Sequence, residues 1–318
     1  PEQSSIDAGS ALLKYLDAIP QHASLLVLVS GGSSSMVEVP VDGLSLTQLQ
    51  QINEYLIASG KDIHAINAWR KRFSKIKGGG LLQYVQRLQC TQLIISDVQD
   101  NDPAIIGSGL LVQPKDDEHD GDDWLQSQLL IDSPQLDIYT PVDTHVIGSN
   151  DIALRAVVDE AAYHGLDRHL HEEFISGDAI EQGRVIGEYL SNAAGGIHVW
   201  GGETTVELPH NPGLGGRNQS MALSLATAID GIEDLSVLVA GTDGIDGNTP
   251  CAGAIVSANS MQQIRQMGFD VATELDRANA GMVLMATGDL FKPGPSLSLI
   301  HISEPTRPPS TSRMPSSA

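Results

Sequence analysis

The stretch that most constrains the fold is residues 237–247, VLVAGTDGIDG. Its apolar start lacks the alternation of a half-exposed strand, so it predicts a strand buried on both faces. The loop that follows has three glycines and two aspartates, and glycine permits left-handed backbone and a close approach to a ligand. Ligands of open α/β sheets bind at the carboxyl ends of strands, so this loop is a candidate site. A tight Asp/Gly turn that caps the next element is the alternative interpretation.

Strand-like and helix-like segments alternate along the whole chain. Apolar runs predict strands at 24–29, 90–96 and 144–148, and two β runs flank Gly201 and Gly202. Helical patterns cover 6–19, 46–59, 153–164, 177–193, 217–229 and 256–268. Ser45 is a suitable N-cap and Gly60 a suitable C-terminal stop for the second helix. The alternation predicts an α/β fold with parallel β-α-β winding throughout.

Composition excludes several classes of protein. The 318 residues allow two domains, and the formal net charge of −22 argues against nucleic acid or an anionic membrane as a partner. Two cysteines, Cys90 and Cys251, indicate a reducing compartment. With no leader pattern at the start and no apolar run of membrane length, we expect a soluble cytoplasmic protein.

Candidate ligand-binding groups in the first half follow the strands. The loop after strand 24–29 offers hydroxyls and backbone N–H groups that suit an anion, from Ser30, Gly31, Gly32, Ser33 and Ser34. It matches neither the P-loop nor the GxGxxG pattern. Asp97 follows strand 90–96 and could hold a magnesium ion or a substrate hydroxyl.

A basic run stands out in this acidic chain. Five basic residues occupy positions 70–77, and on a helix over 62–80 positions 70, 74 and 77 would share one face. Arg70 and Lys77 could therefore point into one site, and Gly78 and Gly79 would let the chain approach a ligand. A solvated basic helix face is the alternative.

The second half of the chain also contains candidate ligand-binding residues. GGETTV places Glu203 and Thr204 at the start of a strand, and GGRNQ places Arg217 and Asn218 at the start of a helix. An arginine beside a helix N-terminus can hold a phosphoryl or carboxylate group with two hydrogen bonds. The loop after strand 237–240 adds the following candidates: Gly241, Thr242, Asp243, Gly244 and Asp246.

GGETTV, GGRNQ and GTDGIDG in this order resemble the MOFRL region of class II glycerate 2-kinases, a family often called hydroxypyruvate reductase. LVSGGSSS, ASGKDIHAINAWRKRFSKIKGGGLL and ISDVQDNDPAIIGSG are similar to motifs of that family's first domain. The resemblance spans about residues 1–296. It implies a Rossmann-like, mostly parallel first domain over 1–195 and a smaller α/β domain over 196–296, with the active site in the cleft between them.

The resemblance also implies an activity: ATP-dependent phosphorylation of D-glycerate at the 2-hydroxyl, with Mg²⁺. A homodimer is left open. Arg217 would hold the transferring phosphoryl group or the glycerate carboxylate, and Lys77 and Arg70 would neutralise phosphate charge. Asp243 or Asp97 would orient the hydroxyl or bind magnesium, with Asp246 as a weaker metal candidate. These parts suit phosphoryl transfer, which depends on positioning and charge neutralisation.

The ends of the chain depart from the family pattern. The sequence starts after the position of a family lysine, and LSLIHISEPTR at 297–307 resembles a sequencing-library adapter. We therefore expect a fragment truncated at both ends, with 297–318 unstructured. Two other functions stay open: an NAD(P)H-dependent hydroxypyruvate reductase, disfavoured by the missing GxGxxG fingerprint, and a non-catalytic ligand-binding module.

Overall fold

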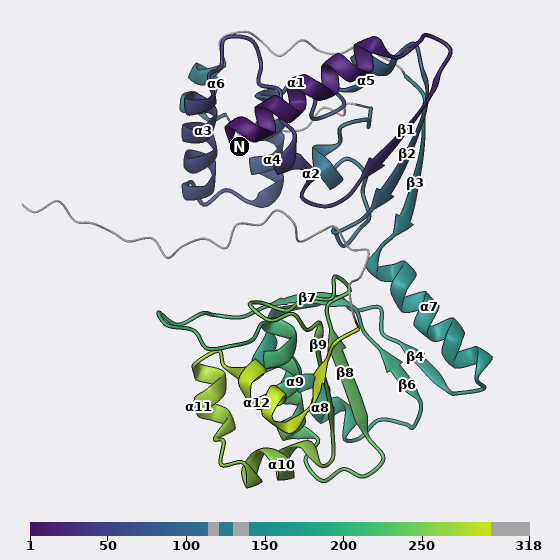
Figure 1. Ribbon diagram of the computed structural model, residues 1–318, viewed down its shortest axis with the longest axis vertical. Helices are drawn as coiled ribbons and strands as arrows, with labels where there is room; N and C mark the ends of the chain where they lie inside the picture. The colour runs from purple at the N-terminus through teal and green to yellow at the C-terminus, as the bar shows by residue number, and fades with distance from the viewer. Residues whose placement is uncertain (114–120, 130–139, 294–318) are drawn as a thin grey trace, which may run out of the picture. The chain divides into compact units, whose positions relative to one another are not determined.

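The computed structural model describes residues 1–113, 121–129 and 140–293, which form two compact units (Figure 1). Unit 1 comprises residues up to 152, and unit 2 begins at 153. The sequence predicted a domain boundary after residue 195, which stays a prediction; residues 153–195 pack with the compact body of unit 2. Residues 297–318, for which an adapter origin was expected, lie outside the described residues. Within the three described ranges, no helix is both long and apolar enough to cross a membrane.

Unit 1 is built on three parallel strands in the order β1-β2-β3. They are β1 (Ser24–Val29), β2 (Gln89–Ile95) and β3 (Val142–Gly148). The helical elements are α1 (Gln3–Ala18), α2 (Ser33–Met36), α3 (Leu46–Ala58), α4 (Ile63–Arg72), α5 (Leu82–Val85), the 3-10 turn η1 (Ile106–Ser108) and α6 (Asp123–Gln128). The predicted parallel winding is confirmed here.

Local signals explain where the helices begin. Ser45 caps α3 by accepting the Gln48 N–H, and the Gln48 side chain accepts the Ser45 N–H in return. Gly60, just past the end of α3, has a left-handed φ of 71°. Asp62 caps α4 by accepting the Ala65 N–H at 2.8 Å. These ends lie where the sequence predicted them.

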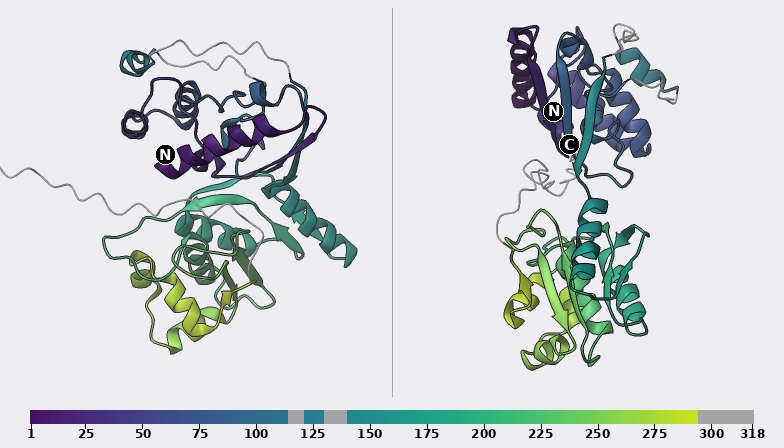
Figure 2. Two further views of the ribbon diagram at one scale, coloured as in Figure 1. Left: turned by 45° about the horizontal axis from the view of Figure 1, so that its top comes forward. Right: turned by 90° about the vertical axis from the view of Figure 1, so that its right-hand side faces the viewer.

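One face of the unit 1 sheet is exposed, so the apolar run at 24–29 is not a strand buried on both faces. Leu26 and Leu28 of β1 are 58% and 71% exposed, and Ile147 of β3 is 54% exposed. Helices α1, α3 and α4 lie on the other side of the strands (Figure 1 and the right-hand view of Figure 2). An apolar run predicts a strand, but it does not show whether other elements will cover one face of the sheet or both.

Unit 2 contains shorter strands and more varied pairing. Its strands are β4 (Arg168–Leu170), β5 (Ile175–Asp178), β6 (Ile197–Val199), β7 (Gly202–Thr205), β8 (Ser236–Ala240), β9 (Gly253–Ser257) and β10 (Leu290–Phe291). Its helices are α8 (Ala179–Leu190), α9 (Arg217–Ala228), α10 (Ser260–Gln266), α11 (Val271–Asp276) and α12 (Ala280–Thr287), while α7 (Asn150–Tyr163) contains the boundary between the units.

The strand pairing in unit 2 corrects the prediction of parallel winding throughout. β4 pairs with β6, and β5 with β7, in parallel, but β8, β9 and β10 form an antiparallel sheet. The predicted helix at 256–268 is also wrong at its start, because 253–257 form β9 and the helix begins at Ser260. β8 packs on one face only: Val239 is buried while Leu238 is 52% exposed.

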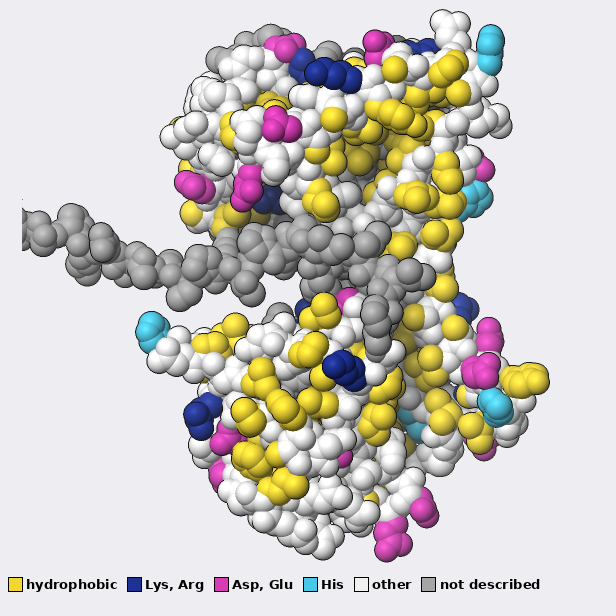
Figure 3. Space-filling view, viewed as in Figure 1, with side chains coloured by type: hydrophobic (Ala, Val, Ile, Leu, Met, Phe, Trp, Pro, Cys, Tyr) yellow, Lys and Arg dark blue, Asp and Glu magenta, His cyan; other side chains and the backbone are white. Residues whose placement is uncertain are grey.

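The core of unit 2 surrounds α9, whose residues 219–226 are all buried. Helix α8 packs against α9 through two glycines. A Cβ at Gly183 would lie 2.4 Å from the Met221 carbonyl oxygen, and one at Gly187 would lie 2.5 Å from Ala228 Cβ. Hydrophobic side chains also reach the surface over α11 and α12 (Figure 3), including Met282 and Met285. The close α8–α9 contact explains why α8 belongs to unit 2.

Two leucine substitutions test this assignment of buried and exposed faces. Leu223→Ala, at a fully buried position of α9, should lower the free energy of unfolding by about 2–5 kcal/mol, because it leaves a cavity. Leu238→Ala, on the exposed face of β8, should cost less than about 1 kcal/mol. Urea denaturation followed by circular dichroism measures both, and equal losses would contradict the one-sided burial of β8.

Candidate active site

The N-terminus of α9 gathers most of the candidates of unit 2. Arg217 opens the helix, and its Nη1 donates to Glu203 Oε1 of β7 at 2.7 Å. Asn218 follows, and its side-chain amide lies beside Gly241, where an added Cβ would be 3.1 Å away. A Cβ at Gly241 would also lie 2.6 Å from Asp243 Oδ1. The motifs GGETTV, GGRNQ and GTDGIDG therefore meet at one point.

The Asp246 carboxylate is the side-chain cap of α9. Its Oδ1 accepts the Asn218 N–H at 3.1 Å and its Oδ2 accepts the Gln219 N–H at 2.7 Å. Gly216, the N-cap residue by position, has no side chain to do this. A Cβ at Gly216 would lie 2.4 Å from Asp246 Oδ1, so glycine is required for the close approach. Both oxygens of Asp246 are thus used by the helix, which makes it a structural group.

Burial raises the pKa of the Asp246 carboxyl to about 6. The two backbone N–H groups and the charge of Arg217 act in the opposite direction, and the charge of Asp243 adds to the rise. Asp246 is only 3% exposed, so loss of water outweighs the two hydrogen bonds. The three charged groups therefore influence one another across the start of α9.

The remaining candidate residues of unit 2 belong to β7 and to the turn after β8. Thr204 is buried in β7 next to the exposed Glu203. Gly241, Thr242, Asp243 and Gly244 form the turn after β8, in which the Gly244 N–H donates to the Gly241 carbonyl at 3.2 Å. Gly244 has a φ of 82°, which requires the left-handed region that favours glycine. The loop therefore contains a tight turn, and this turn presents Asp243 beside Asn218.

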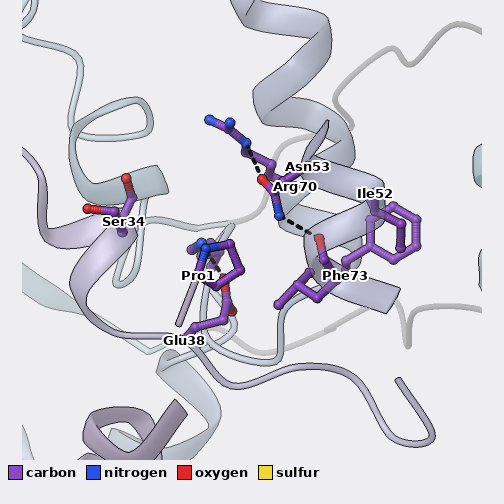
Figure 4. Close-up of a pocket in the computed structure, with 10 residues that line it drawn as sticks. Pro1, Ser34, Glu38, Ile52, Asn53, Arg70 and Phe73 are labelled. Carbon is purple, nitrogen blue, oxygen red and sulfur yellow. Dashed lines mark hydrogen bonds and ion pairs between the residues drawn. The ribbon is translucent and has the colours of Figure 1, made fainter. Parts of the chain in front are cut away.

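In unit 1 the loops after β1 and β2 meet. Gly31 faces Asp97 so closely that a Cβ there would overlap the carboxylate. A Cβ at Gly107 would lie 2.6 Å from Ser33 Oγ, a buried hydroxyl without a hydrogen-bond partner among the described residues. Gly32 is the left-handed N-cap of α2, with a φ of 77°, and Ser30 precedes this turn. Ser34 lines a cavity on α2 (Figure 4).

The basic segment does not form the predicted helix over 62–80. Helix α4 ends at Arg72, and the chain then turns, so positions 70, 74 and 77 do not share a helical face. The turn instead pairs with residues 38–41: the Lys75 N–H donates to the Val39 carbonyl at 2.7 Å, and the Val41 N–H donates to the Phe73 carbonyl at 3.1 Å. This backbone pairing replaces the helix as the reason why Arg70 and Lys77 lie in one place.

Gly78 and Gly79 serve the backbone of unit 1. Their φ angles are 56° and 84°, in the left-handed region. The Gly78 N–H donates to the Ser108 carbonyl at 2.8 Å, and the Gly79 N–H donates to the Gly109 carbonyl at 2.7 Å. Both amides are therefore already paired within the chain, so they fix the turn that carries Lys77.

Lys77 and Arg70 have partners that the sequence did not reveal. Lys77 Nζ lies 2.5 Å from Glu38 Oε2, and both side chains are about nine-tenths or more buried. Arg70 Nε donates to Asn53 Oδ1 at 3.0 Å. Burial lowers the pKa of the Arg70 guanidinium, and the nearby Glu38 charge partly offsets this. A lone glutamate inside the apolar stretch MVEVPV was the one sequence signal for Glu38.

A second missed group supports the α9 cluster. Gln219 Nε2 donates to Thr249 Oγ1 at 2.6 Å, and Gln219 Oε1 is buried without a hydrogen-bond partner among the described residues. Gly215 and Gly281 approach this oxygen so closely that a Cβ would lie 3.3 Å or 2.5 Å from it. Gln219 stands inside the GGRNQ motif, so its position next to Arg217 was the available signal.

Metal binding by the protein alone has no support in the described ranges. No three histidine, cysteine, aspartate or glutamate side chains there are grouped closely enough to hold an ion. A magnesium ion that arrives with nucleotide phosphates needs only one or two carboxylates, because phosphates and water supply its other ligands. Asp243 fits that smaller requirement better than Asp246, whose oxygens cap α9.

Comparison with known proteins identifies the families that this chain matches. Residues 1–135 match a domain of unknown function (DUF4147), and residues 196–301 match the MOFRL family. A protein of Agrobacterium vitis named "Putative hydroxypyruvate reductase" is 32% identical over 95% of this chain and 84% of its own. A glycerate 2-kinase of Pyrococcus horikoshii is 31% identical over 93% of this chain and 73% of its own.

A solved structure gives the same result for the fold. The crystal structure of a glycerate kinase from Thermotoga maritima superimposes with a TM-score of 0.81 at 29% identity, covering 93% of this chain and 75% of that chain. The protein is thus an α/β protein with an N-terminal DUF4147 domain and a C-terminal MOFRL domain. It belongs to the glycerate kinase family.

The raised pKa of Asp246 predicts a pH dependence of stability. A carboxyl whose pKa rises on folding binds its proton more tightly in the folded state, so its contribution falls as pH increases from about 4 to about 6. This fall should amount to about 2–3 kcal/mol and should be missing in Asp246→Asn. Urea denaturation at several pH values measures the difference in slope between the two proteins.

Asp270→Asn is the matched control for this experiment. Asp270 caps α11 by accepting the Thr273 N–H, and hydrogen bonds to Thr273 lower the pKa of its carboxyl. Its contribution is therefore present above its unfolded pKa and is lost as pH falls, which is the opposite sign. Identical pH slopes for wild type and Asp246→Asn would show that the buried carboxyl does not titrate in this range.

Proposed function

We propose that this protein is a glycerate 2-kinase, which transfers the γ-phosphoryl group of ATP to the 2-hydroxyl of D-glycerate. Two relatives carry that name, one of Pyrococcus horikoshii at 31% identity over 73% of its length and one of Thermotoga maritima at 29% over 75% of its length. The observation that carries the proposal is the cluster at the start of α9, where Arg217, Asn218 and Asp243 meet. Phosphoryl transfer requires a positioned cation and an acceptor for a proton.

Arg217 suits the transferring group. Its side chain is 33% exposed and is held at one nitrogen by Glu203. A guanidinium has five N–H donors, so this single bond leaves the others for phosphoryl oxygens. Glu203 fixes the direction of the side chain before any ligand binds. We assign Arg217 to neutralise the charge that develops on the phosphoryl group.

Asp243 suits the acceptor hydroxyl. As the hydroxyl oxygen bonds to the γ-phosphorus, the bond from that phosphorus to the bridging oxygen breaks and ADP leaves. The hydroxyl proton passes to a carboxylate, and Asp243 is the candidate for this proton because Asp246 serves α9. Magnesium would arrive with the nucleotide and neutralise phosphate charge.

The first test is a product assay with ATP, Mg²⁺ and D-glycerate that resolves 2- from 3-phosphoglycerate. We expect 2-phosphoglycerate. Formation of the 3-phospho isomer would keep a kinase and reject the regiochemistry. Relatives named hydroxypyruvate reductase make NADH oxidation by hydroxypyruvate, without ATP, the necessary parallel assay. Turnover there, with no phosphorylated product, would replace the kinase by the reductase.

Arg217→Ala tests the assignment of the phosphoryl group. We expect kcat to fall about 10²- to 10³-fold with the thermal unfolding midpoint almost unchanged, since the side chain is on the surface of unit 2. Arg184→Ala on α8 is the matched control, because Arg184 is exposed and ion-paired with Glu181 and Glu188. The control should retain wild-type kcat. An unchanged kcat in Arg217→Ala would remove Arg217 from the mechanism.

A further inference from the structure

Unit 1 contains a cavity of about 120 Å³ whose lining comes from that unit alone (Figure 4). Ser34 lies on one side of it, Glu38 at its base and Arg70 and Asn53 on another side. Pockets that hold drug-sized ligands have volumes of about 300–1,000 Å³. The cavity is therefore too small for a nucleotide and suits a molecule of a few carbon atoms.

The charge of the lining indicates the kind of molecule. Among the side chains of the lining, Arg70 and Lys77 contribute two positive charges and Glu38 contributes one negative charge, so these side chains carry a net single positive charge. The Lys77–Glu38 pair is closed at 2.5 Å, which makes Arg70 the surplus cation. One surplus cation matches a monocarboxylate.

The wall also has donors that the protein does not use. Arg70 employs only its Nε–H, toward Asn53, and its four Nη hydrogens have no acceptor within the described part of the chain. Ser34 Oγ likewise makes no hydrogen bond to a described residue. Among the described residues Lys77 Nζ donates to Glu38 alone, although an ammonium has three hydrogens. A carboxylate in the cavity would satisfy these donors with charge-assisted bonds.

The opposite wall is apolar. Leu49 and Ile52 of α3 and Phe73 after α4 line it, and all three are at most 3% exposed. Such a wall favours a short carbon chain over further phosphate oxygens. Glu38 Oε2, although paired with Lys77, remains an acceptor at the base of the cavity and can receive a hydrogen bond from a hydroxyl group.

We propose that this cavity of unit 1 binds the small hydroxy acid, with its carboxylate held by Arg70 and Ser34 and the hydroxyl that does not react directed to the Lys77–Glu38 pair. The inference rests on the proposed kinase function and adds a division of substrates: the acid to unit 1, the phosphoryl donor to the Arg217 cluster. It assigns Arg70 and Lys77 to the binding of the acid, whereas the resemblance implied that they neutralise phosphate charge. Arg70 becomes a specificity-determining residue for the acid.

Separate KM values for the two substrates test the proposal. Arg70→Met removes the surplus cation and should raise the KM for D-glycerate roughly 10- to 100-fold, the range for a lost charged hydrogen bond, while the KM for ATP stays within about twofold. Lys75→Met is the matched control, since Lys75 lies on the same turn but pairs with exposed Asp42 outside the cavity. The control should leave both KM values unchanged.

A second variant and a binding measurement test the cavity independently of catalytic turnover. Ser34→Leu fills the cavity from a half-buried position, so the fold should persist while calorimetric binding of D-glycerate without ATP is lost. Unchanged glycerate binding in both variants, or a rise in the KM for ATP alone, would overturn the proposal. If the wild-type protein binds glycerate but phosphorylates nothing, the acid site stands and the kinase function fails.

Discussion

The carboxylate of Asp246 holds the first turn of α9 through two backbone N–H groups, and the geometry of unit 2 depends on this contact. Helix α9 is the centre of the core, and its first residue is Arg217. A buried carboxylate at a helix N-terminus satisfies donors that the helix itself leaves open. Because Gly216 permits the approach, the cap comes from a loop that also carries Asp243. One hydrogen-bonded contact thus places the cation and the second carboxylate side by side.

In unit 1, the pairing of two backbone segments positions the charged side chains. Residues 38–41 run beside residues 73–75, and the left-handed glycines at 78 and 79 join the next turn to residues 108 and 109. Glu38 and Lys77 are thereby brought together in a buried pair. Removing one member of such a pair leaves an uncompensated charge and is strongly destabilising. Arg70 differs, because its hydrogen-bond partner is the neutral side-chain amide of Asn53.

The two clusters have different chemical characters, which supports different ligands. The α9 cluster combines one arginine with three acidic side chains, Glu203, Asp243 and Asp246. The unit 1 cavity has a surplus positive charge and an apolar wall. A kinase must hold a donor with several negative charges and an acceptor with one, and it must keep the reacting groups oriented. The surplus positive charge among the side chains of the unit 1 cavity suits the singly charged acceptor.

The sequence by itself determined the α/β class, most helix and strand positions, and the meeting of the strand-end motifs. Caps such as Ser45 and Asp62, and glycines in tight turns, act over a few residues, so they can be identified locally. It did not determine the antiparallel β8–β9 pair, the exposed face of β1, the end of α4 or the pairing of Glu38 with Lys77. Only the tertiary structure decided these, because apolar runs look alike in one-sided and two-sided strands. Likewise, the choice of partner for a buried charge depends on residues that are distant in the chain.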